Sequence, residues 1–202
     1  MSFDWAGDPF PARRILLGVT GSIEAVTVPQ YIMLLRHVLG VEVRAVLTHQ
    51  ATTLVAPRAV AVACGHSVVL DDEEDATVVH LELTRWADLL LVLPATANML
   101  ARVAHGMADD LLTTCVLAAQ CPVIFVPCMN DAMWFKPVVQ RNVAVLEADG
   151  YGVVPPAEGV SAVDGKVGLG AVPNIITILE WTRDFLRQSQ REAPAPEATG
   201  TR

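Results

Sequence analysis

The sequence predicts a single α/β domain of the doubly wound, Rossmann-like or flavodoxin-like class, in which helices cover both faces of a mostly parallel sheet. Apolar runs alternate with helical patterns along the chain, which favours parallel strands joined by crossover helices. The 202 residues suit one such unit, and 52% hydrophobic but only 5% aromatic residues predict a core of Ala, Val and Leu. Two apolar runs end at a proline followed by small or amide residues, as expected where a buried strand reaches a binding crevice.

Strands are expected wherever a short apolar run is bounded by turn residues. These runs are Ile15 to Val19, Val41 to Leu47, Ser67 to Leu70, Leu89 to Leu93, Val123 to Val126 and Gly152 to Val154.

Helical patterns fill the segments between these runs. The first opens at Thr20-Gly21-Ser22 and continues to about Val38, with Pro29 forcing a late start or a kink. The others are Thr48 to Cys64 with an interruption at Pro57, Ala97 to Val103, Asp109 to Ala119, Pro137 to Ala148 and Asn174 to Arg187, while Asp71 to Asp75 reads as an acidic loop.

The domain is expected to span residues 12–188, between a flexible segment at 1–11 and a disordered tail at 189–202. The tail combines Pro, Ala, Gly and charge without large apolar groups. Within the domain, residues 157–172 contain four glycines and no apolar periodicity, which predicts a mobile flap that closes over a substrate.

Composition excludes several kinds of partner. A net charge of −8 with 14 scattered basic residues argues against nucleic acid. No apolar run reaches the length of a membrane span and the first ten residues lack a signal-peptide pattern, so we expect a cytoplasmic protein. The four cysteines have neither paired nor zinc-finger spacing, which predicts no metal site and no disulfide framework.

The junction at Gly21-Ser22 is the first candidate binding element. It joins an expected strand to an expected helix, where backbone N–H groups favour an anion. An ordinary helix N-cap explains the same residues equally simply.

Four motifs in order carry a resemblance to a known family. They are His80 upstream of Arg85-Trp86-Ala87-Asp88, the Pro-Ala-Thr-Ala-Asn turn at 94–98, the segment from Gly106 to Thr114 (Gly-Met-Ala-Asp-Asp-Leu-Leu-Thr-Thr), and Pro-x-Met-Asn at 127–130 followed by Met133-Trp134. Over roughly residues 13–180 the chain resembles the flavin-containing cysteine decarboxylases. That family includes phosphopantothenoylcysteine decarboxylases and the peptidyl-cysteine decarboxylases of lantibiotic-type peptide maturation.

The resemblance implies a bound FMN, with FAD possible, in a homo-oligomer that is a trimer or a dodecamer. Hydroxyls and amides suit the donors and acceptors along a flavin edge. Helix capping is an open alternative for Thr48, Thr52 and Asp109. The implied cofactor-binding residues are Gly21, Ser22, Ile23, Thr48, Thr52, Pro94, Thr96, Ala97, Asn98, Asp109, Cys128 and Met129.

Catalysis is assigned by the resemblance to His80, for proton transfer, and to Asn130, whose neutral amide holds a substrate carboxylate while leaving it free to depart as carbon dioxide. Substrate contacts are implied for Asn130, Met133, Asp164 and Gly165. Glu24 and Met99 depart from the small apolar residue and the threonine usual in the family, and a carboxylate at position 24 would repel a phosphate unless it points away.

The flap decides which branch of the family the chain resembles. Asp164 stands where the coenzyme A branch carries a cysteine, and Pro173-Asn174-Ile175 looks like the peptidyl-cysteine branch. The expected function is therefore oxidative decarboxylation of the C-terminal cysteine of a ribosomally made precursor peptide to an aminoenethiol.

The alternatives are a phosphopantothenoylcysteine decarboxylase of coenzyme A biosynthesis, a flavin prenyltransferase and a non-catalytic flavoprotein regulatory subunit. The presence of both His80 and Asn130 favours an enzyme over a binding module.

Overall fold

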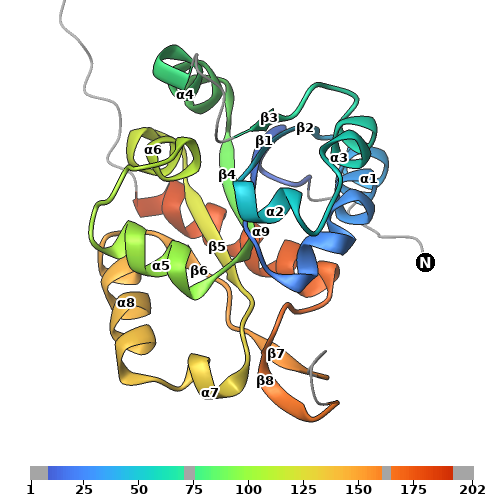
Figure 1. Ribbon diagram of the computed structural model, residues 1–202. Helices are drawn as coiled ribbons and strands as arrows, with labels where there is room; N and C mark the ends of the chain where they lie inside the picture. The colour runs from blue at the N-terminus through green and yellow to red at the C-terminus, as the bar shows by residue number, and fades with distance from the viewer. Residues whose placement is uncertain (1–8, 71–75, 161–164, 193–202) are drawn as a thin grey trace, which may run out of the picture.

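The computed structural model describes residues 9–70, 76–160 and 165–192. Their central feature is a six-stranded parallel sheet in the order β3-β2-β1-β4-β5-β6 (Figure 1). The strands are β1 (Arg14–Val19), β2 (Glu42–Leu47), β3 (Val69–Leu70), β4 (Leu89–Ala95), β5 (Val123–Pro127) and β6 (Gly152–Val153). The predicted doubly wound α/β class is confirmed.

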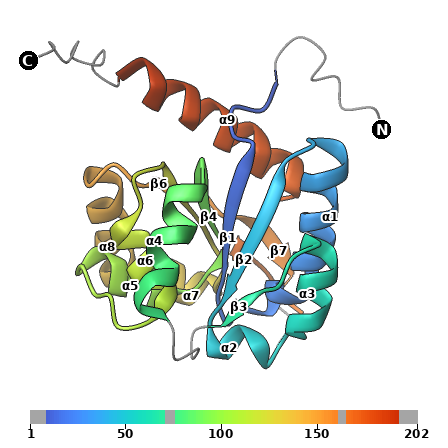
Figure 2. The same cartoon turned by 90° about the horizontal axis from the view of Figure 1, so that it is seen from above.

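Helices cover both faces of this sheet (Figure 2). One face carries α1 (Val28–Val38), α3 (Pro57–Cys64) and α9 (Ile175–Glu192), and the other carries α4 (Ala76–Trp86), α5 (Ala97–Ala104), α6 (Leu111–Ala118) and α8 (Pro137–Ala148). Three short helices, η1 (Ile23–Thr27), α2 (His49–Thr52) and α7 (Asp131–Trp134), follow the carboxyl ends of strands.

Alternation along the buried strands divides the core in two. Leu89, Leu91 and Leu93 of β4 pack with α1, α3 and α9, whereas Leu90 and Val92 pack with α4, α5, α6 and α8. Successive side chains of a strand point to opposite faces, so a strand covered on both sides must be apolar throughout. All seven residues of β4 are buried, which is why the sequence showed a continuous apolar run there.

Most expected elements are present, with informative differences at their ends. The chain after β1 first forms the 3-10 helix η1 and becomes α-helical only at Val28, which is the late start that Pro29 predicted. The interruption at Pro57 separates α2 from α3. The helices α4 and α7 were not foreseen, and α9 continues to Glu192, beyond the expected domain end at residue 188.

The predicted flap contains regular structure in its described part. β7 (Ala157–Val160) and β8 (Val167–Ala171) form an antiparallel hairpin that is separate from the main sheet. Asp164 and the acidic loop at 71–75 lie outside the described residues. Near the amino end, Phe10 is buried against the α1, α3 and α9 side of the core, so the expected flexible segment at 1–11 has an anchored residue.

No helix in the described part of the chain combines the length and apolar character that a membrane span requires.

Candidate functional site

The sheet order places its switch point, where doubly wound folds form their ligand-binding crevice, between β1 and β4. These strands pair with each other, while the chain runs outward from β1 to β2 and β3 on one side and from β4 to β5 and β6 on the other. In doubly wound folds, ligands bind at the carboxyl ends of strands where the order reverses in this way. The residues that follow β1, β2, β4 and β5 therefore define the candidate site.

Thr20, directly after β1, ties the two central strand ends together. Its hydroxyl donates to the carbonyl oxygen of Pro94 at 2.7 Å and accepts the N–H of Thr96 at 3.1 Å. The side chain is buried; its hydroxyl gives the Thr96 N–H a partner and adds a second bond to the Pro94 carbonyl, which also accepts the Thr20 N–H at 3.3 Å. The peptide bond between Leu93 and Pro94 is cis. Sequence reasoning missed Thr20 as a site residue, although its position one residue beyond the strand was a usable signal.

Gly21 is required by close packing. A Cβ at this position would lie 2.4 Å from the Cβ of Gln50, so the turn after β1 can lie against α2 only with glycine.

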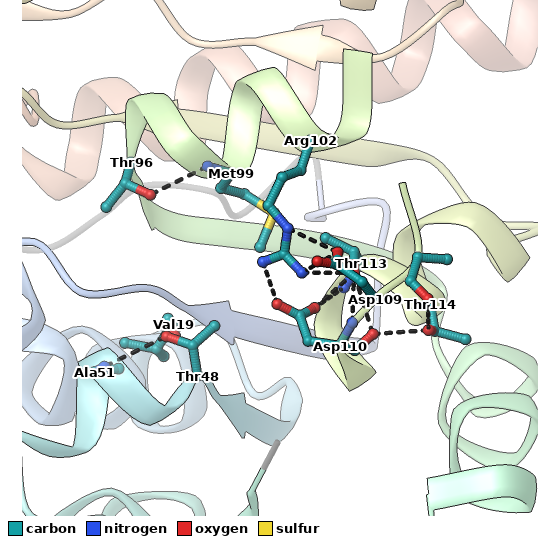
Figure 3. A network of polar contacts seen from close by, with 11 residues as sticks. Val19, Thr48, Ala51, Thr96, Met99, Arg102, Asp109, Asp110, Thr113 and Thr114 are labelled. Carbon is teal, nitrogen blue, oxygen red and sulfur yellow. Dashed lines mark hydrogen bonds and ion pairs between the residues drawn. The ribbon is translucent and has the colours of Figure 1, made fainter. Parts of the chain in front are cut away.

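The two threonines after β2 make local bonds. Thr48 is the N-cap of α2, accepting the N–H of Ala51 at 3.3 Å (Figure 3). The hydroxyl of Thr52 donates to the carbonyl of His49 at 2.8 Å. The Thr48 contact matches the capping alternative, whereas Thr52 lies inside α2 and is neither of its caps.

Ser22 and Cys128 bring the ends of β1 and β5 together. The backbone N–H of Cys128 donates to Ala95 at 3.0 Å, which fixes the residue beside the end of β4. Burial raises the pKa of the Cys128 thiol, while a hydrogen bond from Ser22 acts in the opposite direction. The Ser22 side chain makes no N-cap bond to η1, in contrast to the simple capping alternative, and the side chain of Ile23 is exposed.

Glu24 does not present a free carboxylate to the crevice. Its Oε1 accepts the hydroxyl of Tyr31 at 2.5 Å and that of Thr27 at 2.7 Å. Burial and the adjacent carboxylate raise the pKa of Tyr31 to about 12, so the phenol stays a donor. The two hydroxyls hold this carboxylate beside η1 and α1, so it is not free to move toward a bound anion.

Two polar side chains follow β4: the hydroxyl of Thr96, which already accepts a hydrogen bond, and the amide of Asn98. Thr96 is the N-cap of α5 and accepts the N–H of Met99 at 3.2 Å. Ala97 is half-buried and Asn98 is exposed in the first turn of the helix. Met99 is 2% exposed and packs into the core, which explains why an apolar side chain fits where the family usually has threonine.

Asp110, the neighbour of the predicted Asp109, caps α6. The N-cap of α6 is Asp110, which accepts the N–H of Thr113 at 2.7 Å and forms a capping box with it. Asp109 is exposed and pairs with Arg102, and the same guanidinium also pairs with Asp110 (Figure 3). The capping role considered for Asp109 is therefore wrong. Arg102 itself, missed from the sequence, holds the loop before α6 against α5.

Asn130 and Met133 lie in the short helix after β5. Asn130 is the N-cap of α7, and its Oδ1 accepts the N–H of Met133 at 2.9 Å. Both side chains are exposed. The cap uses the amide oxygen of Asn130 and leaves its NH₂ group as the donor that can address a ligand.

The hairpin lies directly on this turn. The N–H of Met129 donates to the carbonyl of Gly170 at 3.0 Å. A Cβ on Gly168 would come within 2.9 Å of the Asp131 carboxylate, so a larger residue would require this side chain or β8 to shift. Gly165, two residues before β8, is exposed and has a φ of 70°.

His80 is not brought to Asn130 within one chain. It is half-buried in α4, and Figure 1 places α4 and α7 at opposite ends of the molecule. The crevice therefore gathers the predicted residues at the ends of β1, β4 and β5, but not the predicted proton-transfer group.

Residues 8–187 match the model of the Flavoprotein family. The chain belongs to this family. The resemblance to flavin-containing cysteine decarboxylases is thereby confirmed, because relatives with that activity in their names are similar over most of this chain.

Three relatives illustrate the kinds of protein to which this chain is similar. The chain is 40% identical to phosphopantothenoylcysteine decarboxylase of Mus musculus, covering 87% of this chain and 88% of that protein. It is 38% identical to mersacidin decarboxylase of Bacillus sp. (strain HIL-Y85/54728), covering 72% and 75%. Identity to the coenzyme A biosynthesis bifunctional protein CoaBC of Escherichia coli (strain K12) is 37%, and the match spans only 42% of that longer protein.

Similar solved structures likewise include both peptidyl-cysteine decarboxylases and PPC decarboxylases. The FMN-dependent cysteine decarboxylase SpaF is 46% identical, with a TM-score of 0.70 and coverage of 84% of this chain and 96% of that one. A PPC decarboxylase mutant complexed with pantothenoylaminoethenethiol is 30% identical, with a TM-score of 0.76 and coverage of 86% and 98%. The peptidyl-cysteine decarboxylase EpiD, complexed with a substrate peptide, is 27% identical, with a TM-score of 0.74 and coverage of 84% and 97%.

Proposed function

We propose that this protein binds FMN and oxidatively decarboxylates the C-terminal cysteine of a ribosomally made precursor peptide, releasing an aminoenethiol. The observation that carries the proposal is the exposed amide of Asn130 at the end of β5, beside the crevice between β1 and β4. The similarity to SpaF supports the choice of cofactor and reaction type.

The residues at the crevice suit a flavin mononucleotide. Ser22 and Asn98 offer neutral donors and acceptors, and the nearby carboxylate of Glu24 is held by Tyr31 and Thr27. The turn at 20–22 also precedes the helical segment, where backbone N–H groups favour a phosphate. When bound, FMN would accept hydride from the cysteine β-carbon.

The protein's own residues would then act on the substrate. The NH₂ group of Asn130 donates to the leaving carboxylate without stabilising its charge as strongly as a lysine would. His80 would move the thiol proton, because an imidazole can both accept and donate a proton. Met133 and Gly165 would contact the substrate, as would Asp164, which lies outside the described residues.

The peptide is preferred over phosphopantothenoylcysteine because residues 157–172 contain no cysteine. The resemblance implies that a flap cysteine of the coenzyme A branch protonates the enethiolate, after which the reduced flavin returns hydride to the product. In a chain without this cysteine, the oxidised product would leave the enzyme.

The separation of His80 from Asn130 supports a site shared between copies in a homo-oligomer, either a trimer or a dodecamer. Ile23 and Val26 of η1 and Met107 before α6 are large apolar side chains that are about half exposed (54%, 50% and 45%) around the crevice elements. Burying such side chains against a second copy is favourable, at about 25 cal/mol per Å² of apolar surface. We propose that the assembly works in the cytoplasm.

The test is mass spectrometry of the product after incubation of the FMN-loaded protein with a Cys-terminated peptide in air. Loss of carbon dioxide and two hydrogens, about 46 Da by the stoichiometry of the oxidative route, is expected. A parallel reaction with phosphopantothenoylcysteine measures the alternative. A loss of about 44 Da, or turnover of the phosphopantothenoyl substrate alone, would assign the protein to the coenzyme A branch.

A further inference from the structure

Glu24 forms an anchored negative charge at the start of the first helical segment. Its carboxylate accepts hydroxyls from Thr27, one turn later, and from Tyr31, in α1. Both donors are on the same side of the helical segment, and the Tyr31 phenol stays protonated because its pKa is raised to about 12. A carboxylate held by two hydroxyl donors has a fixed position on this helical segment.

Hydrogen bonds join the turn before Glu24 to residues at the end of β4. The N–H of Ser22 donates to Thr20 at 2.8 Å, and Thr20 in turn donates to Pro94 at 2.7 Å. On the other side, Cys128 lies beside Ala95 and interacts with both Ser22 and Glu24. The charge of Glu24 is therefore held at a fixed place behind the ends of β1, β4 and β5, in a partly buried environment where screening is weak.

We propose that Glu24 lowers the reduction potential of the flavin bound in this crevice, an inference that rests on the proposed FMN site. Two-electron reduction adds negative charge to a flavin, and a fixed carboxylate nearby disfavours that added charge. The effect is electrostatic and acts through space, so it requires no contact between Glu24 and the cofactor.

A low potential fits the proposed reaction, in which hydride is not returned to the product. The two electrons must then pass to an external oxidant, and dioxygen can accept them together with two protons to give hydrogen peroxide. Lowering the potential of the flavin favours this transfer. Glu24 would thus support reoxidation in a chain whose flap has no cysteine at 157–172.

The test compares three variants by dye-coupled redox titration of the FMN-bound protein, followed by absorbance. Glu24→Gln removes the charge, while its amide oxygen can still accept from Thr27 and Tyr31. Tyr31→Phe removes one donor and keeps the charge. Glu42→Gln is the control for net charge. Glu42 is at the amino end of β2, whereas the crevice lies at the carboxyl ends of the strands.

The midpoint potential of Glu24→Gln is expected to move to a more positive value, while Glu42→Gln stays at the wild-type value and Tyr31→Phe does not move in the positive direction. A Glu24→Gln potential equal to wild type would overturn the inference. Equal positive shifts in Glu24→Gln and Tyr31→Phe would also overturn it, since they would indicate a structural effect. A chain that takes up no FMN would overturn the proposed function itself, and this inference with it.

Discussion

Met129 and Gly170 are in contact through their backbones at the point where the hairpin meets the main domain. The Met129 N–H donates to the Gly170 carbonyl at 3.0 Å, and a Cβ on Gly170 would lie 2.1 Å from the Met129 carbonyl oxygen. Gly170 also has φ of 145°, which other residues rarely adopt. The hairpin can therefore be seated beside Asn130 only with glycine at position 170.

Gly170→Ala should unseat the hairpin. Backbone strain costs about 1–3 kcal/mol, and the contact with Met129 adds to it. Hydrogen–deuterium exchange of the segment around Met129 should become faster, and turnover should fall. Gly165→Ala is the matched control, since Gly165 also has positive φ (70°) but no atom of the described residues lies within 4 Å of the new Cβ. Equal exchange in the two variants would show that the contact with Met129 is unimportant.

Asn130→Asp should separate the structural from the catalytic role of this residue. An aspartate oxygen can still cap α7, so the free energy of unfolding should stay near wild type. The variant lacks the NH₂ donor and repels a substrate carboxylate, so kcat should fall by about 10²-fold or more. Asn130→Ala should lose the cap as well. Near-normal turnover of Asn130→Asp would remove Asn130 from the reaction.

Thr20→Val should weaken both the fold and the crevice. The substitution keeps the shape of the side chain but leaves the buried Pro94 carbonyl and Thr96 N–H each short of one partner. We expect a loss of about 2 kcal/mol in the free energy of unfolding, measured by urea denaturation, and weaker FMN binding. Thr20→Ser retains the hydroxyl and should behave like wild type, and a Val variant of wild-type stability would contradict the role of Thr20.

Asp88 should make stability depend on acid pH. Hydrogen bonds from the Arg14 guanidinium and from the backbone N–H groups of Arg13 and Arg14 hold the pKa of Asp88 below its usual value. The stabilisation is thus complete above the unfolded pKa of about 3.9 and is lost as the pH falls through the lower folded pKa.

Asp88→Asn should accordingly cost about 1 kcal/mol at neutral pH and progressively less below about pH 4, in urea unfolding at several pH values. Asp184→Asn is the control, because the side chain of Asp184 is 68% exposed and pairs with its neighbour Arg183. A cost that does not change with pH would show that the charge of Asp88 is not responsible.

The strands were predictable because a strand buried on both faces must be continuously apolar, as in Leu89 to Leu93. The order of the strands was not, since it depends on pairing between distant segments. The helix α4 escaped notice because Thr77, Val78 and Val79 are β-branched residues with weak helix propensity, and packing against the sheet outweighs that preference.

The site was predictable where short motifs mark strand ends and unpredictable where geometry decides between neighbours. Asp109 and Asp110 are adjacent carboxylates, and only the direction in which the chain enters α6 determines which one caps it. The seating of the hairpin depends on which face of β8 meets α7, and the glycines at 168 and 170 read in the sequence simply as flexible residues.

Thr182 in α9 offers a gain in stability. Its side chain is 1% exposed, and its hydroxyl has no hydrogen-bond partner among the described residues. A buried hydroxyl without a partner costs about 1–3 kcal/mol of desolvation, whereas a methyl group of similar size does not. Thr182→Val should therefore raise the free energy of unfolding by about 1 kcal/mol and increase the Tm. Thr177→Val, at an exposed position of the same helix, should leave both near wild type, and a destabilised Thr182→Val would show that the hydroxyl is satisfied in solution.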